Sequence, residues 1–199
     1  VIGNPPYAGH SLNNQVDWIV DKVYDYKRGY PDLQKPGQAK WLQDDYVKFL
    51  RFAEWNVEQI DQGLVGFITN HAWLDNPTFK GMRRHFLDRF QRLSVLDLHG
   101  NANKNEVALD GSPDKNVFEI KQGVAVSLLR RSWKGKLDGA PIVERSELLG
   151  TVATKFVALM ASSVQQLPAV RFQPLPPELI FVSLDDDRKR EYDTFVPIP

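Results

Sequence analysis

Apolar residues recur at every third or fourth position in two stretches of the chain, which is the spacing of one face of an α-helix. The first stretch runs from Trp41 to about Gln62, and Gly63 follows where a helix C-cap belongs. The second runs from Thr78 to Phe90. The pattern therefore predicts two amphipathic helices. Their inward-facing positions are Tyr46, Phe49, Leu50, Ala53, Val57 and Ile60 in the first, and Phe79, Met82, Phe86 and Phe90 in the second.

Three short, mainly apolar runs predict strands at residues 64–69, 93–98 and 124–129. The first run is continuous, which is typical of a strand buried on both faces of a parallel sheet. The opening Val-Ile-Gly resembles the end of another buried strand, and the prolines that follow stop it because proline cannot donate to a ladder. Residues 116–120 are expected to be extended. This order of elements predicts an α/β sheet that ends in an antiparallel edge strand.

The remaining segments have weaker patterns. Residues 8–40 are rich in Gly, Asn, Asp, Pro and Lys, and we expect a long, partly helical excursion there. Residues 132–150 look loosely structured, residues 151–163 predict a short helix, and the later part is rich in proline. We therefore expect one α/β unit over residues 1–131 and a mainly helical or irregular tail over residues 132–199.

Composition narrows the class of protein. Basic and acidic residues number 25 each, so the net charge is zero and bulk electrostatics alone would not hold nucleic acid. The chain has no cysteine, which excludes disulfides and a cysteine nucleophile and fits a reducing compartment such as the cytoplasm. No apolar run approaches the roughly 18 residues of a membrane span. We therefore expect a cytoplasmic protein that does not enter a membrane.

The most informative local motif is Asn4-Pro5-Pro6-Tyr7, at the end of the first predicted strand. Ligands in open α/β sheets bind outside the carboxyl ends of the strands. The amide oxygen of Asn4 and the carbonyl oxygen of Pro5 are two hydrogen-bond acceptors, and Tyr7 adds an aromatic plane. This combination suits a flat amine such as that of adenine. The alternative is that the prolines only end a strand and the tyrosine packs in the core.

This motif resembles the hallmark motif of amino-methyltransferases that act on adenine in DNA. Later segments resemble further motifs of that family in the same order. The chain is most similar to the methyltransferase portion of single-chain type I (type ISP-like) or type II restriction-modification enzymes. The matching segments are Asp45-Tyr46 with Phe49, residues 63–70, Trp73-Leu74, residues 83–87, residues 116–118 and residues 123–129.

The resemblance implies a Rossmann-like domain that transfers a methyl group from S-adenosylmethionine to an adenine flipped out of double-stranded DNA. Asn4 and the Pro5 carbonyl would accept hydrogen bonds from the adenine amino group, next to Pro6. Tyr7 would stack on the base, and Phe118 would press on it from another side. Alignment and fixed dipoles would then supply the catalysis without a metal.

The chain also departs from the family pattern. The glycine-rich loop that binds the cofactor and the acidic residue that binds its ribose should precede Asn4, and the sequence has no Gly-x-Gly pair to replace them. We therefore expect residues 1–131 to be the second half of a catalytic domain, inactive alone. Residues 132–199 would be a linker and the start of a target-recognition region. The cofactor-binding half and the recognition domain would be its partners in the parent enzyme.

Other polar residues carry weaker signals. Asn70, His71 and Trp73 follow a strand end and are candidates for contact with DNA or the base, although Trp73 could equally pack in the core. The histidines at 71 and 85 fit no metal-binding spacing, so surface or loop positions are expected. Four cations on one helix, at positions 80, 83, 84 and 89, suit a solvated face or phosphate contact.

The sequence thus supports the hypothesis of a partial adenine-specific DNA methyltransferase from a restriction-modification system. One alternative is a catalytically inactive DNA-binding or scaffold fragment. Another is an amino-methyltransferase that acts on cytosine or on a protein glutamine.

Overall fold

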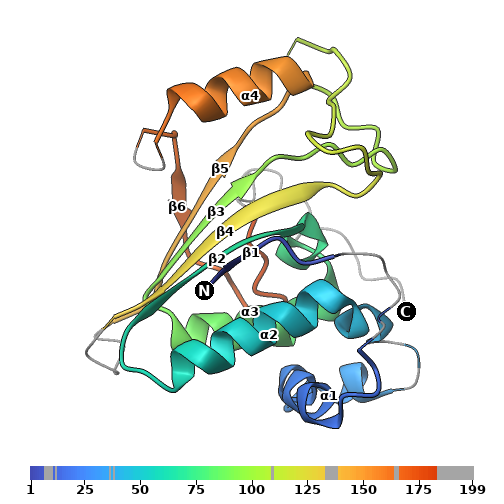
Figure 1. Ribbon diagram of the computed structural model, residues 1–199, viewed down its shortest axis with the longest axis vertical. Coiled ribbons are helices and arrows are strands. Elements are labelled where there is room, and N and C mark those ends of the chain that lie inside the picture. Colours follow the sequence, from blue (N-terminus) through green and yellow to red (C-terminus); the bar gives the residue numbers. More distant parts are fainter. Residues whose placement is uncertain are drawn as a thin grey trace, which may run out of the picture.

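A computed structural model describes most of the chain, namely residues 1–6, 11, 13–35, 37, 39–108, 110–132, 139–163 and 166–182. Within these residues, six strands form one mixed sheet in the order β1-β2-β4-β3-β5-β6 (Figure 1). The strands are β1 (Ile2–Gly3), β2 (Gly63–Asn70), β3 (Arg92–Asp97), β4 (Val124–Arg131), β5 (Ile142–Glu147) and β6 (Val170–Phe172). The predicted α/β class is confirmed.

Strand direction follows from the connections. β1 runs parallel to β2, and β3 runs parallel to β5. β4 lies between β2 and β3 and is antiparallel to both, so it occupies the centre of the sheet rather than its edge. The antiparallel edge strand is β6, which pairs with β5. An antiparallel strand therefore forms one edge of the sheet, as predicted, but this strand, β6, was not predicted from its sequence.

The helices are α1 (Asp17–Tyr24), α2 (Asp45–Glu58), α3 (Lys80–Arg89) and α4 (Val152–Ala161). Short 3-10 turns join them, namely η1 (Asp25–Lys27), η2 (Pro31–Gln34), η3 (Lys40–Gln43), η4 (His71–Leu74) and η5 (Pro77–Phe79). Helices α1 to α3 lie on one side of the sheet, and α4 lies on the other (Figure 1). Both helices expected from the apolar spacing are therefore present, although each is shorter than the pattern.

The predicted C-cap at Gly63 is wrong. α2 ends at Glu58, and the backbone N–H of Gln59 closes the last turn by donating to Trp55 and Val57 carbonyls. Gly63 instead begins β2, where an added Cβ would lie 2.9 Å from a methyl group of Val57. A glycine is needed here because the strand passes close to the helix, not because the helix ends.

The inward face of α3 is confirmed, because all four of its predicted apolar positions are buried. The prediction for α2 is wrong at two positions, since Phe49 is 41% and Ile60 is 55% exposed. Ile60 lies beyond the helix end, and the buried face of α2 is rotated away from Phe49. It is rotated because it also includes Arg51 and Glu54, which ion-pair with each other and with neighbouring helices. An apolar pattern does not reveal buried charges.

Two further corrections concern the sheet. Ile2 is 88% exposed, so β1 is an edge strand in the described sheet rather than a buried one. Residues 142–147, expected to be loose, form β5. Its sequence did not resemble a buried strand because its charged residues pair across the sheet, as Glu144 does with Arg92.

The core lies between the sheet and helices α2 and α3, and the tail contributes to it. Phe181 is fully buried and its ring centroid lies 5.5 Å from that of Trp73. Arg83 on α3 donates two hydrogen bonds to the carbonyl oxygen of Glu178. Residues beyond 131 are therefore part of the same packed structure. The acidic-basic run at 185–190 lies outside the described residues.

Candidate active site at the carboxyl edge of the sheet

The carboxyl ends of β1, β2 and β3 lie at one edge of the sheet. Because β2 and β3 are both antiparallel to β4, they point the same way, and their last residues Asn70 and Asp97 pair with the adjacent residues Val124 and Ala125. Asn4 follows β1, which is parallel to β2. This is the edge at which open α/β sheets bind ligands.

The motif after β1 combines a buried residue with an exposed one. Pro5 is buried, whereas Asn4 and Pro6 are exposed. The side-chain amide of Asn4 is therefore accessible to a ligand, while the adjacent backbone is held by packing and by the fixed φ of proline. Tyr7, the predicted stacking residue, lies outside the described residues.

The two candidates after β2 have different environments. Asn70 is half-buried, and its side-chain oxygen accepts a hydrogen bond from the Ala72 backbone at 2.9 Å, which begins η4. Trp73 is fully buried, and its indole N–H donates to Thr69 Oγ1 at 3.1 Å. The predicted substrate contact by Trp73 is corrected, because its ring packs against Phe86 and Phe181 and has no exposed surface.

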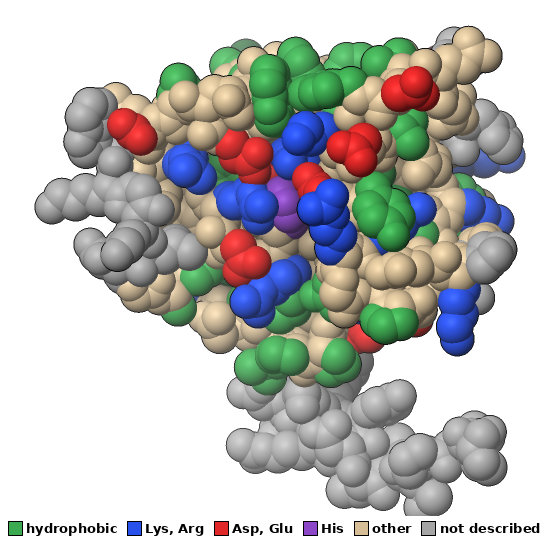
Figure 2. Space-filling model, turned by 90° about the horizontal axis from the view of Figure 1, so that it is seen from below, with side chains coloured by type: hydrophobic (Ala, Val, Ile, Leu, Met, Phe, Trp, Pro, Cys, Tyr) green, Lys and Arg blue, Asp and Glu red, His purple; other side chains and the backbone are tan. Residues whose placement is uncertain are grey.

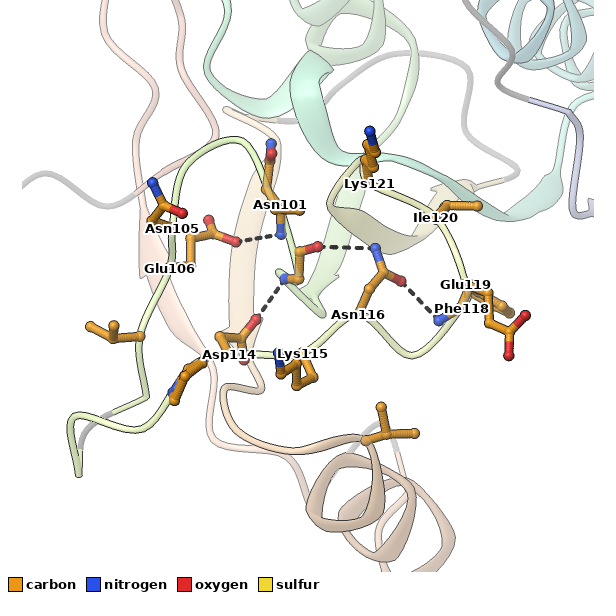
Figure 3. Close-up of a pocket in the computed structure, with 15 residues that line it drawn as sticks. Asn101, Asn105, Glu106, Asp114, Lys115, Asn116, Phe118, Glu119, Ile120 and Lys121 are labelled. Atoms are coloured by element: carbon orange, nitrogen blue, oxygen red, sulfur yellow. Dashed lines mark hydrogen bonds between the residues drawn. The ribbon is translucent and has the colours of Figure 1, made fainter.

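Phe118 lies in a long connection at the same edge, residues 98–123, which we name the edge loop. The stretch 116–120 is a series of bends rather than the expected extended segment. Phe118 is 36% exposed and lines a groove of about 700 Å³ formed by the edge loop and Val152 of α4 (Figure 3). Phe118 is thus available for contact with a ligand at this edge.

Asn116 determines the shape of the edge loop around Phe118. Its side-chain amide donates to the carbonyl oxygen of Gly100 (3.1 Å), and its side-chain oxygen accepts from the Phe118 backbone (2.8 Å) (Figure 3). The amide also donates to the carbonyl oxygen of Gln122 (2.6 Å). Gly100 has a positive φ of 78°, and an added Cβ would lie 2.4 Å from Asn116 Cα. One side chain therefore closes the loop and sets the backbone of Phe118.

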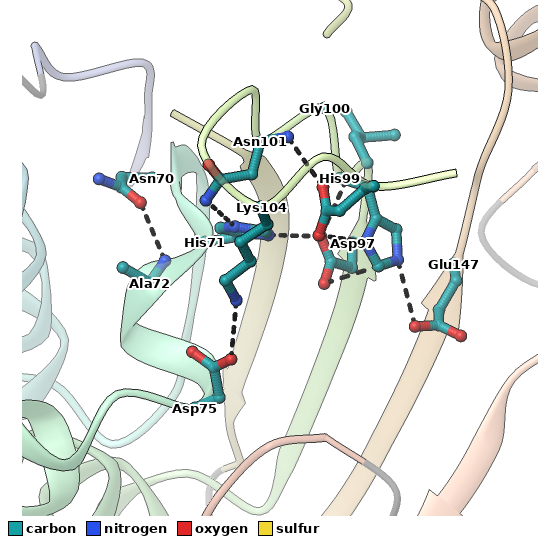
Figure 4. A network of polar contacts seen from close by, with 12 residues as sticks. Asn70, His71, Ala72, Asp75, Asp97, His99, Gly100, Asn101, Lys104 and Glu147 are labelled. Carbon is teal, nitrogen blue, oxygen red and sulfur yellow. Dashed lines mark hydrogen bonds and ion pairs between the residues drawn. The ribbon is translucent and has the colours of Figure 1, made fainter. Parts of the chain in front are cut away.

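A network of charged side chains lies beneath the edge loop. Asp97, at the end of β3, accepts from His71 Nδ1 at 3.0 Å (Figure 4). It also accepts from Arg145 Nη2 at 2.6 Å. His99 contacts Glu106 through Nδ1 and Glu147 through Nε2, each at 3.2 Å. These side chains line a second pocket of about 310 Å³.

The network shifts two pKa values in opposite directions. Burial alone would raise the pKa of Asp97, but hydrogen bonding from His71 and the charge of His99 hold it well below its usual range. Burial alone would lower the pKa of His99, but hydrogen bonds to Glu106 and Glu147 raise it to about 9. His99 is therefore a cation at neutral pH.

Two groups of side chains in the described residues have metal-like spacing. His71, Asp97 and His99 have ligand atoms within 4.8 Å of one another, as do Glu54, Glu58 and His85. In the first group Arg145 already pairs with Asp97, and protonated His99 cannot ligate. The second group pairs with arginines of α2 and α3. As arranged, neither group suits a metal ion.

The sequence matches the model of the Eco57I restriction-modification methylase family over residues 1–103, which is more than half of the chain. The chain belongs to this family. The match includes the strand ends Asn4, Asn70 and Asp97, and it ends before Phe118 and most of the edge loop. No curated protein matches the chain.

Solved structures share the fold of this methylase chain. It is similar to the ATP-dependent type ISP restriction-modification enzyme LlaBIII bound to DNA, with a TM-score of 0.72 and 19% identity over 94% of the chain. It is similar to DrdV in a DNA complex, with a TM-score of 0.73 and 25% identity over 94%. It is also similar to a nuclease-deletion mutant of the type ISP enzyme LlaGI in complex with a DNA substrate mimic, with a TM-score of 0.68 and 19% identity over 88% of the chain. The chain spans only 13%, 18% and 14% of these three chains.

The cations on α3 of the methylase chain do not form an open basic surface. Lys80 pairs with Asp32, and Arg84 pairs with Asp88. Arg83 is buried, and Arg89 pairs with Glu58. Figure 2 shows acidic and basic side chains intermingled on the helix-bearing face. Arg84 is 56% exposed, so the solvated-face interpretation fits it better than phosphate contact does. Lys80 is only 12% exposed, and the buried Arg83 has a structural role.

Sequence reasoning missed most of the charged network in this member of the methylase family. His71 and His85 are buried and hydrogen-bonded to Asp97 and Glu54, so the expected surface or loop positions are wrong. The pairing of His71 with Asp97 was not predicted because the two residues are 26 positions apart in the sequence. One usable signal was an aspartate at the carboxyl end of a predicted strand, where ligand-binding residues gather.

The described part of the chain has no helix long and apolar enough to cross a membrane.

The raised pKa of His99 predicts a pH-dependent stability difference. In the folded protein the pKa is about 9, above the usual value of 6.5, so protonation stabilises the fold fully below about pH 6.5. This contribution should be lost as the pH rises through 9. We expect wild type to exceed a His99→Asn variant in thermal unfolding midpoint at pH 6, with the difference shrinking towards pH 9.5. Asparagine tolerates the positive φ of 51° at this position. A difference that is constant with pH would contradict the pairing.

Proposed function

We propose that this chain is the base-binding part of a DNA methyltransferase that methylates the amino nitrogen of adenine in a restriction-modification system. One observation carries the proposal. Asn4 is exposed, directly follows β1 and is followed in the chain by the buried Pro5. Membership of the methylase family supports it, as do the DNA complexes of the structural relatives. Double-stranded DNA would be the partner, with the target base flipped out of the helix.

In this proposal the chain orients the amino group of the base. The Asn4 side-chain oxygen and the Pro5 carbonyl oxygen accept its two N–H groups, which directs the nitrogen lone pair towards the methyl donor. Tyr7 and Phe118 would hold the ring by stacking, and half-buried Asn70 lies at the neighbouring strand end. Stacking of this kind contributes about 1–3 kcal/mol per base.

S-adenosylmethionine would supply the activated methyl group. We assign no residue of this chain to binding it, because the sequence has no Gly-x-Gly pair and β1 is an exposed edge of the described sheet. The cofactor would be held by a segment of the parent enzyme that adds to this edge. The tail beyond residue 150 would lead towards the region that recognises the DNA target.

A labelled-methyl assay tests the proposal. The protein expressed from its complete gene is incubated with methyl-labelled S-adenosylmethionine and unmethylated duplex DNA, and the DNA is digested to nucleosides. Label in N6-methyladenine is the expected result. Label in N4-methylcytosine or in a protein glutamine would overturn the adenine assignment. DNA binding without any transfer would instead support a catalytically inactive binding fragment.

A further inference from the structure

The side chain of Lys155 is fully buried, although lysine is rarely buried in folded proteins. Its ammonium group contacts the carbonyl oxygens of Leu98 (2.7 Å) and Lys115 (2.6 Å). It also pairs with both carboxylate oxygens of Asp114, at 2.8 and 2.9 Å. One residue of α4 is thereby bonded to two separate parts of the edge loop.

Asp114 extends these contacts to two further positions. Its carboxylate accepts from the backbone N–H groups of Gly100 and Gly150, each at 2.6 Å. Gly100 lies just after β3, and Gly150 lies just before α4. The Lys155–Asp114 ion pair therefore joins the end of β3, the middle of the edge loop and the start of α4.

A continuous series of contacts leads from this ion pair to Phe118. Asp114 holds the N–H of Gly100, and the carbonyl oxygen of Gly100 accepts from Asn116. Asn116 in turn accepts from the backbone of Phe118. Lys155 itself lies outside the groove that Phe118 lines, so any effect on a ligand there must pass through the loop.

α4 makes little use of apolar burial. Lys155 is its only buried residue, whereas Phe156, Val157 and Met160 are 50%, 69% and 87% exposed. Replacing a buried ion pair by apolar groups is often neutral for stability or even favourable. Stability alone is therefore a weak explanation for a lysine at this position.

We propose that Lys155 is a positioning residue, which holds the edge loop through Asp114 and so sets the orientation of Phe118 towards the substrate base. This inference rests on the proposed function, because it assigns Phe118 to the flipped adenine. A segment predicted to be a linker and the start of a target-recognition region would then control the geometry of base binding.

A double-mutant cycle tests the inference in the protein expressed from its complete gene. We expect Lys155→Met to lower kcat for DNA methylation at least about tenfold, since small misplacements of a substrate-contacting group have effects of this size or larger. DNA affinity should stay within about twofold, because Lys155 does not reach the groove. In a Phe118→Ala background, Lys155→Met should lower kcat less than about twofold, because the side chain that it positions is absent.

Lys104→Met is the matched control, since Lys104 is a half-exposed lysine of the same loop and pairs with Asp75. Its kcat should equal that of wild type. If Lys155→Met does not fold, Asp114→Asn replaces it in the same cycle. Wild-type kcat in a folded Lys155→Met or Asp114→Asn protein, or losses that multiply with that of Phe118→Ala, would overturn the positioning role. So would failure of both variants to fold, since the ion pair would then be structural. A wild-type protein that transfers no methyl group would instead contradict the proposed function.

Discussion

Replacing Asn4 with alanine is expected to lower methyl transfer at least about a hundredfold, the effect of removing one preorganised polar group from a catalytic site. The loss should appear in kcat, because in the proposed function the amide oxygen orients the reacting amino group rather than holding the DNA backbone. Folding should be unaffected, since Asn4 is exposed while the neighbouring Pro5 supplies the packing. Methyl transfer by the protein from its complete gene, with DNA affinity measured in parallel, checks this.

Two variants sharpen the test of Asn4. Asn56→Ala is the matched control, because Asn56 is a partly exposed asparagine of α2 whose amide donates only to the Phe52 backbone among the contacts described. It should keep wild-type kcat. Asn4→Asp retains an accepting oxygen and should keep more activity than Asn4→Ala. An Asn4→Ala protein with wild-type kcat would remove the main support for the proposed function.

Replacing Arg83 with alanine is expected to destabilise the fold by about 3 kcal/mol or more, because it leaves several buried carbonyl groups without donors. Arg83 is fully buried and donates to the carbonyl oxygens of Trp73 (2.7 Å), Asn76 (2.9 Å) and Glu178 (2.7 and 3.1 Å). Burial lowers its pKa to about 10, so it still donates as a cation at neutral pH. Its loss would remove the side-chain hydrogen bonds that join α3 to the tail and to η4.

Amide hydrogen exchange measures this effect within a larger protein. Peptides covering residues 71–90 and 174–182 should exchange about a hundredfold faster in Arg83→Ala, since each 1.4 kcal/mol corresponds to a factor of ten. Arg84→Ala is the matched control on the same helix, because Arg84 is exposed and only pairs with Asp88. It should exchange like wild type. Equal exchange in the two variants would show that the buried hydrogen bonds contribute little.

The elements that the sequence predicted well are those with local signals. Apolar spacing placed α3, and apolar runs placed β2, β3 and β4 within one or two residues of their bounds. The prolines after Gly3 correctly ended β1. In each case the decisive information lies within about ten consecutive residues, because a helix face or a strand repeats over that distance.

The failures involve residues whose environment depends on distant partners. β5 was missed because Glu144 and Arg145 look exposed until Arg92 and Asp97 are brought beside them. The His71–Asp97 pairing spans 26 residues, and the Lys155–Asp114 pairing spans 41. A buried charge is stable only when it is paired, and no local pattern shows where its partner lies.

The sequence by itself determined the α/β class, the main helices and strands, and the presence of an Asn-Pro-Pro-Tyr motif directly after a strand. It did so because backbone periodicity and hydrogen-bonding chemistry belong to neighbouring residues. Only the tertiary structure decided that Trp73 is core rather than substrate contact and that the tail completes the sheet. The bonds between α4 and the loop that bears Phe118 are likewise seen only in the tertiary structure. These outcomes follow from packing and from ion pairs between segments far apart in the chain, which exist only once the chain has folded.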